Sequence, residues 1–164
     1  QAVAAYGGTI KDYAGDGVLI LVGAPIPVAD HPQRGLALAR RLLQVDRDLI
    51  SHWAGPELEL GMGVGVASGK VTVGAIGRDR MEYTAVGPAV NIAARLCGQA
   101  RDGEICVLAE TAMLAGVPVT ASECRTAPLK GLSEVSYVLL APSDAEGDPQ
   151  EVTELPVTGL PAAG

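Results

Sequence analysis

The motif GDG at residues 15–17 places an acidic side chain between two glycines, immediately before the apolar run VLILV. A carboxylate held at the end of a strand can ligate a hard cation such as Mg²⁺, and magnesium sites that handle phosphates usually combine one or two carboxylates with substrate oxygens. Asp-Gly is also a strong signal for a hairpin turn. Asp16 is therefore a candidate metal ligand, although the turn taken alone favours a purely structural role.

Asn91 and Arg95 form a second candidate group, because they are four residues apart in the segment AVNIAARLCGQA. At that spacing two side chains project from the same face of a helix. A guanidinium held on a helix can grip phosphate oxygens and stabilise the charge that develops in a phosphoryl-transfer transition state. Many surface helices carry an Asn and an Arg, so the pair alone does not establish this chemistry.

Other polar residues have weaker claims. Lys130 lies in PLKGLSE, a predicted turn, where its ammonium could reach a substrate phosphate, although a solvated lysine is the default explanation. His31 and His52 stand alone at the ends of a predicted helix, where solvated or capping roles explain them better than metal binding. The segment GMGVGVASG is not a dinucleotide-binding loop, because its glycines alternate and a strand follows instead of a helix.

The composition limits the classes of function. The chain has 164 residues, 48% of them hydrophobic, which suits one globular domain. A net charge of −7 argues against a nucleic-acid partner, and an anionic ligand would need a metal or a local cation. Three scattered cysteines without CxxC spacing argue against a disulfide framework or zinc site and favour a reducing compartment. No apolar run approaches the roughly 18 residues that a membrane span needs.

Hydrophobic periodicity predicts the elements that position these side chains. The run at 18–22 is typical of a strand buried on both faces. Gly61, Gly63 and Gly65 alternate with apolar residues, which predicts a strand with one bare face and another element packed closely against it. An amphipathic helix is expected from Arg34 to about Trp53, with Asp30 as its N-cap and one apolar face formed by Leu38, Leu42, Val45 and Leu49.

Strands and helices alternate along the chain, but several strand pairs are joined too tightly for parallel crossovers. The expected fold class is α+β, a sandwich with a mixed, mostly antiparallel sheet and helices on one side. Residues 141–164 lack periodicity and are expected to form a flexible tail or linker. The opening QAVAAYGG reads as the end of a helix, so the chain is expected to begin inside a larger domain.

Six segments in this order, between about Tyr6 and Leu140, resemble the class III nucleotidyl cyclases: GGTIKDYAGDGVLILVGAP, DHPQRGLALA, GMGVGVASGKVTVGAIG, RMEYTAVGPAVNIAARL, GEICVLAET and LKGLSE. The resemblance implies a ferredoxin-like α/β sandwich that works as a head-to-tail homodimer with active sites at the interface. Such enzymes convert a nucleoside triphosphate to the 3′,5′-cyclic monophosphate and pyrophosphate, using two Mg²⁺ or Mn²⁺ ions.

The resemblance also assigns roles to single residues. Asp16 matches the second of two metal-binding aspartates, Asn91 the ribose-orienting asparagine, and Arg95 the transition-state arginine. Thr84 matches a base-contacting position, and Lys130 stays a candidate substrate contact. In the family one subunit supplies the metal ligands and the other the base, Asn and Arg contacts, so Asp16 and Arg95 of one chain would serve different sites.

The sequence departs from the family in three places. The opening strand with the first metal aspartate would lie before Gln1, so residues 1–140 are expected to be an N-terminally truncated catalytic domain. Asp12 stands where a lysine usually reads adenine, and the adjacent Lys11 should face the other way unless the backbone bulges. Asp12 favours GTP as the substrate, because a carboxylate accepts hydrogen bonds and guanine offers N1–H and amino donors. Pro88 replaces a common Asp or Asn but suits a first helical turn.

The expected function is a cyclase of intracellular signalling, located in the cytoplasm, acting on ATP, the commoner family substrate, or GTP. The alternative is a catalytically degenerate cyclase-like module that dimerises and regulates. An upstream sensor or membrane domain in the longer protein is left open by this sequence.

Overall fold

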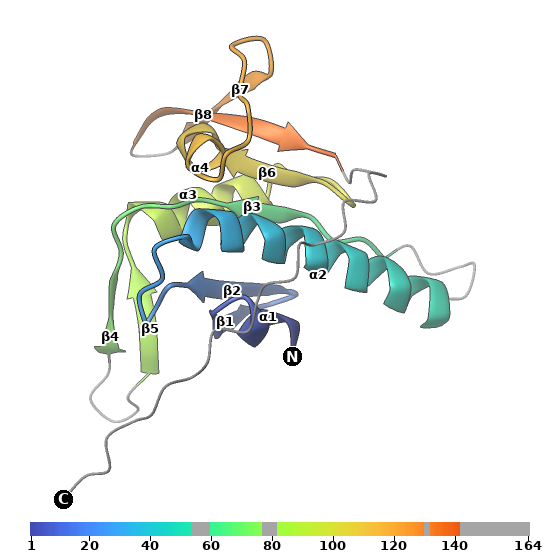
Figure 1. The fold of residues 1–164 in the computed structure, drawn as a ribbon, viewed down its shortest axis with the longest axis vertical. Helices are drawn as coiled ribbons and strands as arrows, with labels where there is room; N and C mark the ends of the chain where they lie inside the picture. The colour runs from blue at the N-terminus through green and yellow to red at the C-terminus, as the bar shows by residue number, and fades with distance from the viewer. Residues whose placement is uncertain (54–59, 77–81, 130–131, 142–164) are drawn as a thin grey trace, which may run out of the picture.

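The computed structural model describes residues 1–53, 60–76, 82–129 and 132–141 (Figure 1). Within them the chain forms four helices and eight strands. In chain order the elements are α1 Ala2–Ala5, β1 Gly8–Ala14, β2 Gly17–Val22, α2 His31–Trp53, β3 Val64–Val66, β4 Thr72–Ile76, β5 Glu82–Val86, α3 Pro88–Cys97, β6 Ile105–Leu108, α4 Ala109–Leu114, β7 Cys124–Leu129 and β8 Leu132–Leu140.

The strands form three sheets, most of whose pairs are antiparallel. The largest sheet has the order β3-β6-β8-β7, in which only β3 and β6 are parallel. The hairpins β1–β2 and β4–β5 are separate antiparallel sheets. The prediction of a mixed, mostly antiparallel α+β fold is confirmed.

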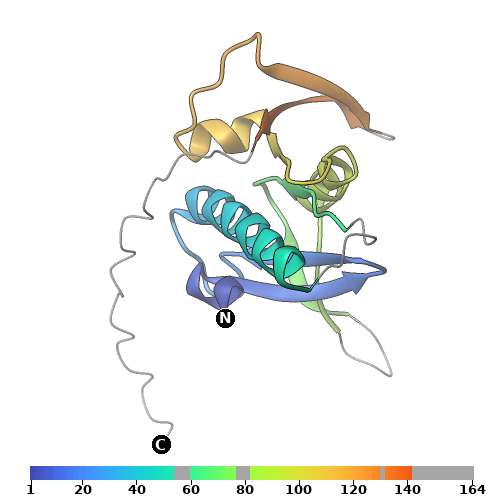
Figure 2. The ribbon, with the colours of Figure 1, turned by 90° about the vertical axis from the view of Figure 1, so that its right-hand side faces the viewer.

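Helices cover both faces of the largest sheet, so the prediction of helices on one side is wrong. On β6, Ile105 and Val107 pack in one hydrophobic cluster with residues of α2 and α4. Cys106 and Leu108 pack in a second cluster with Leu96 of α3. Figure 2 shows α2 and α4 on one side of β6 and α3 on the other. All four residues of β6 are buried, and an apolar strand of this kind needs a cover on each face.

The apolar face of α2 matches the predicted one only in part, since Leu38 is buried as predicted. The helix begins at His31, three residues earlier than expected, and its residues in the core cluster are Leu36, Ala39 and Leu43. Leu49, which was predicted to lie on the apolar face, is 53% exposed. Figure 1 shows the reason, because the C-terminal part of α2 extends beyond the sheet.

The strand β2 is not buried on both faces, which corrects a second prediction. Leu21 is buried, but Val18 is 47% exposed. Within the described residues β2 hydrogen-bonds only to β1, and β3 only to β6. One edge of β2 and one edge of β3 therefore have no strand partner in this part of the chain, and α2 contacts both strands.

Candidate active site

Asp16 lies where the sequence places it, in the turn that joins β1 to β2. Ala14 pairs with Gly17 across this turn, and Gly15 has a φ of +65°. A two-residue hairpin loop with glycine first has this backbone. The Asp16 side chain is exposed, so its carboxylate oxygens are accessible to a cation.

The described residues offer Asp16 little help in binding a metal. No three His, Cys, Asp or Glu side chains among them are grouped closely enough to hold an ion. A single carboxylate nevertheless fits Mg²⁺ that arrives with substrate phosphates, because such ions keep most of their ligands from phosphate and water. Asp16 therefore fits a shared site, to which further ligands must be added.

Asn91 and Arg95 lie one turn apart on α3, and both side chains are exposed. Ala89 and Leu96 provide the buried face of the same helix. No described residue forms a hydrogen bond or ion pair with either exposed side chain. The predicted pair is thus brought together on one helix, with its donors available to a ligand.

The glycines of the segment before and within β3 explain how α3 is held. A Cβ on Gly65 would collide with the carbonyl oxygen of Ala93 and the backbone nitrogen of Cys97. A Cβ on Gly63 would lie 2.7 Å from the carbonyl oxygen of Ala100, just after α3. The prediction that another element packs closely against this bare face is confirmed, and that element is the helix that carries Asn91 and Arg95.

The first turn of α3 contacts the link between β3 and β4, which is formed by residues 67–71. Gly87 is the N-cap with a φ of +153°, and Pro88 follows at the start of the helix, as predicted. A Cβ on Gly87 would lie 2.8 Å from the carbonyl oxygen of Lys70, and one on Gly69 would lie 3.2 Å from the Cβ of Ala89. The helix therefore begins in close contact with the link.

Thr84, the predicted base contact, is half-buried on β5 and pairs with Gly74 on β4. A Cβ on Gly74 would meet nothing within 4 Å, so there is open space on the strand opposite Thr84. The strand β5 also contacts β1, which carries Lys11 and Asp12. The fold thus brings together the two strands on which base-contacting residues were predicted.

A β-bulge at Lys11 is the feature that sequence reasoning did not establish. Ile10 pairs with Ile20 and Asp12 pairs with Leu19, so Lys11 is an extra residue on β1. Bulges interrupt the alternation of side chains and re-aim them, and they are common next to active sites. The strict alternation that separated Lys11 from the Asp12 position therefore does not hold here. No residue type in KDYAG identifies the bulge in advance.

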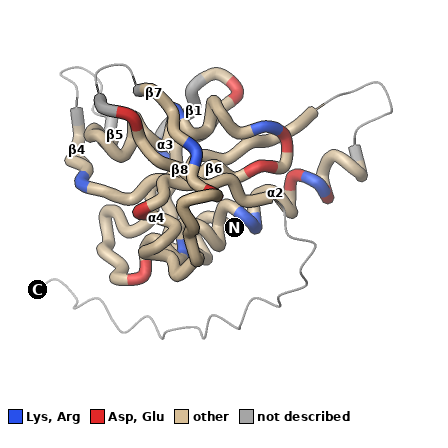
Figure 3. Tube along the Cα trace, turned by 90° about the horizontal axis from the view of Figure 1, so that it is seen from above, with Lys and Arg blue, Asp and Glu red and all other residues tan. Residues whose placement is uncertain are grey.

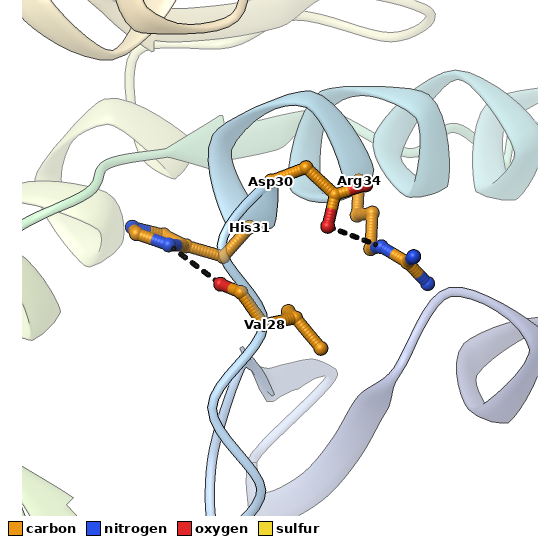
Figure 4. Close-up of polar contacts among 4 residues, drawn as sticks. All are labelled: Val28, Asp30, His31 and Arg34. Carbon is orange, nitrogen blue, oxygen red and sulfur yellow. Dashed lines mark hydrogen bonds and ion pairs between the residues drawn. The ribbon is translucent and has the colours of Figure 1, made fainter.

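The start of α2 carries a local polar cluster (Figure 4). Asp30, predicted to be the N-cap, directly precedes the helix, and its Oδ1 accepts a hydrogen bond from Nε of Arg34 at 2.7 Å. This hydrogen bond lowers the pKa of Asp30 below its ordinary value. Nδ1 of His31 lies 3.2 Å from the carbonyl oxygen of Val28. The contacts are structural and lie on a different helix from Asn91 and Arg95.

Lys130 lies outside the described residues. Basic and acidic residues are interspersed along the described chain, where Lys and Arg do not gather in one broad patch (Figure 3). None of the helices in the described ranges is long and apolar enough to span a membrane.

The chain is similar to proteins of one family. The family described as "Adenylate and Guanylate cyclase catalytic domain" matches residues 9–141. The uncharacterized protein Rv1319c of Mycobacterium tuberculosis is 38% identical over 105 residues, which are 63% of this chain and 18% of that protein. The chain therefore spans less than a fifth of this relative.

Solved structures agree with the sequence match. The guanylyl cyclase Cya2 is 31% identical, with a TM-score of 0.76 over 89% of this chain and 76% of that one. The adenylyl cyclase CyaB from P. aeruginosa is 29% identical, with a TM-score of 0.61 over 85% of this chain and 74% of that one. From its sequence and its fold, this chain belongs to the adenylate and guanylate cyclase catalytic domain family.

Proposed function

We propose that the protein converts ATP or GTP to the 3′,5′-cyclic monophosphate and pyrophosphate. The observation that carries the proposal is the exposed pair Asn91 and Arg95 on α3, a helix fixed by backbone contact with β3. Arg95 would bind phosphate oxygens and stabilise charge in the transition state. Asn91 would orient the ribose, which matters because phosphoryl-transfer catalysis depends mainly on positioning and charge stabilisation.

The proposed cofactors are two Mg²⁺ or Mn²⁺ ions, for which Asp16 would supply one carboxylate. When bound, such ions lower the pKa of a coordinated hydroxyl and neutralise phosphate charge. Asp16 itself would hold its carboxylate at a fixed place, because the hairpin turn anchors it between two paired strands.

The proposed assembly is a homodimer whose two subunits share each active site. Asp16 lies in the β1–β2 hairpin, whereas Asn91 and Arg95 lie on α3, which packs against β3 and β6. Placement on separate parts of the fold supports the expectation that Asp16 and Arg95 of one chain serve different sites. Each site would then combine Asp16 of one subunit with Arg95 of its partner.

The catalytic domain is proposed to include an extended segment that precedes Gln1 and carries the other metal-binding aspartate. Two observations support this. One edge each of β2 and β3 has no strand partner among the described residues, and α2 covers both strands. The matched part of Cya2 is 76% of its chain, so that enzyme has residues without a counterpart here. A further strand that lay between β2 and β3 in space would pair with the unpartnered edge of each.

The proposed base contacts are Thr84, Asp12 and, through the bulge, Lys11. A lysine can donate to N1 of adenine, whereas a carboxylate accepts from N1–H and the amino group of guanine. Lys130 is proposed as a further substrate contact. The base site would thus admit ATP as well as GTP.

The test is to incubate the purified full-length protein with ATP or GTP and Mg²⁺ or Mn²⁺, and to separate the products by chromatography. Formation of cyclic AMP or cyclic GMP with equimolar pyrophosphate supports the proposal. A folded, dimeric protein that forms neither product under any of the four conditions would contradict it and favour the regulatory module.

A further inference from the structure

Thr111 on α4 is a buried polar side chain outside the proposed active site. It is 0% exposed, and among the described residues it is the one polar side chain that is fully buried. Its Oγ1 accepts a hydrogen bond of 2.7 Å from the backbone nitrogen of Ser68. Ser68 is half-buried, so removing this acceptor would destabilise the folded state to the extent that water cannot take its place at the amide.

The hydrogen bond fixes the link on which α3 begins. Ser68 is followed by Gly69 and Lys70, the residues whose backbone lies against Gly87 and Ala89. Asn91 is hydrogen-bonded through its backbone nitrogen to the carbonyl oxygen of Gly87, at 3.4 Å. A continuous series of contacts therefore runs from the Thr111 hydroxyl through the link to the first turn of α3.

We propose that Thr111 is a positioning residue for the nucleotide, acting through the link on the helix that carries Asn91 and Arg95. This inference rests on the proposed function of those two residues. Small displacements of catalytic groups lower turnover strongly, and a misplacement of 1 Å can cost about 100-fold. A shift in the first turn of α3 would move Asn91 and Arg95 together, because both are on the same ten-residue helix.

The variants Thr111→Val and Thr111→Ser separate the hydroxyl from the volume of the side chain. Valine keeps the branched shape and removes the acceptor, whereas serine keeps the acceptor. The matched control is Ala112→Gly, which weakens the same helix at another buried position and leaves the Thr111 hydroxyl in place.

In the full-length protein, Thr111→Val should lower kcat about 10-fold or more, with a smaller change in KM. Thr111→Ser should restore most of the turnover, and Ala112→Gly should retain it at a temperature where all variants are folded. Wild-type kcat in folded Thr111→Val would overturn the inference, because a merely structural hydroxyl would affect only stability.

Hydrogen–deuterium exchange gives a readout that does not depend on turnover. Thr111→Val should speed exchange at residues 68–70 and also at 89–91, whereas Thr111→Ser and Ala112→Gly should not speed it at both places. Faster exchange confined to 68–70 would overturn the inference. If the wild-type protein forms no cyclic nucleotide, the proposed function fails, and exchange at 89–91 still decides whether Thr111 positions α3.

Discussion

Gly65 of β3 lies directly against Ala93 of α3, so closely that a Cβ on Gly65 would collide with the Ala93 carbonyl oxygen. Ala93 stands between Asn91 and Arg95 in the sequence. The backbone of the strand, rather than a long side chain, therefore sets the distance between β3 and the helix that carries the candidate site. Backbone contacts of this kind leave few alternative packings, which suits a site that depends on position.

The first prediction concerns this contact. Gly65→Ala should destabilise the protein by about 1–3 kcal/mol, because the added methyl group overpacks the interface with α3. Gly74→Ala is the matched control, since it adds the same methyl group to a strand where a Cβ meets nothing within 4 Å. Urea unfolding of both variants measures the difference. Equal losses of stability in the two variants would refute the close packing of α3 on β3.

The second prediction concerns Arg95. In the full-length protein Arg95→Ala should reduce kcat by about 10²–10³, the loss expected when one transition-state donor is removed. Its free energy of unfolding should change by less than about 0.5 kcal/mol, because the side chain is exposed. Arg40→Ala, an exposed arginine on α2, is the control and should keep wild-type turnover. Wild-type turnover in Arg95→Ala would remove Arg95 from its proposed role.

The third prediction concerns the choice of base. Lys11→Ala should lower kcat/KM for ATP by about tenfold relative to GTP, which corresponds to the loss of one hydrogen bond. Asp12→Lys should move the ratio in the opposite direction, toward ATP. Competition assays with both nucleotides measure the two ratios. An unchanged ratio in Lys11→Ala would show that the bulge does not bring Lys11 to the base.

The fourth prediction concerns pH. The hydrogen bond from Arg34 lowers the folded-state pKa of Asp30, so its contribution to stability is present above the unfolded pKa of about 3.9 and is lost as pH falls through the folded pKa. The Asp30 side chain is 52% exposed, so Asp30→Asn should cost less than about 0.5 kcal/mol at pH 7. Unfolding at pH 7 and at low pH should show this small difference vanishing in acid. A difference that grows in acid would have the wrong sign.

The sequence predicted those elements whose signals are local. The glycine alternation predicted both β3 and the close approach of another element, and GDG predicted the hairpin turn of Asp16. The spacing of Asn91 and Arg95 was sufficient to place them on one helix face. Each of these features depends on residues within a few positions of one another, which periodicity can detect.

Features that depend on distant partners could not be predicted. The strand β7 has no strong apolar run, and it forms by pairing with β8. The bulge at Lys11 depends on the register between β1 and β2. The hydrogen bond from Ser68 to Thr111 joins residues 43 positions apart, so nothing in either segment indicates it. The exposed end of α2 and its shifted apolar face depend on how far the sheet extends beneath it.

The most direct test of the shared active site is to mix two inactive variants of the full-length protein, Asp16→Ala and Arg95→Ala. If each site combines Asp16 of one subunit with Arg95 of its partner, a mixed dimer holds one intact site and one doubly defective site. Equal mixing with subunit exchange should then restore about a quarter of wild-type cyclase activity, because half of the dimers are mixed. A mixture that exchanges subunits but stays as inactive as its two components would contradict the account.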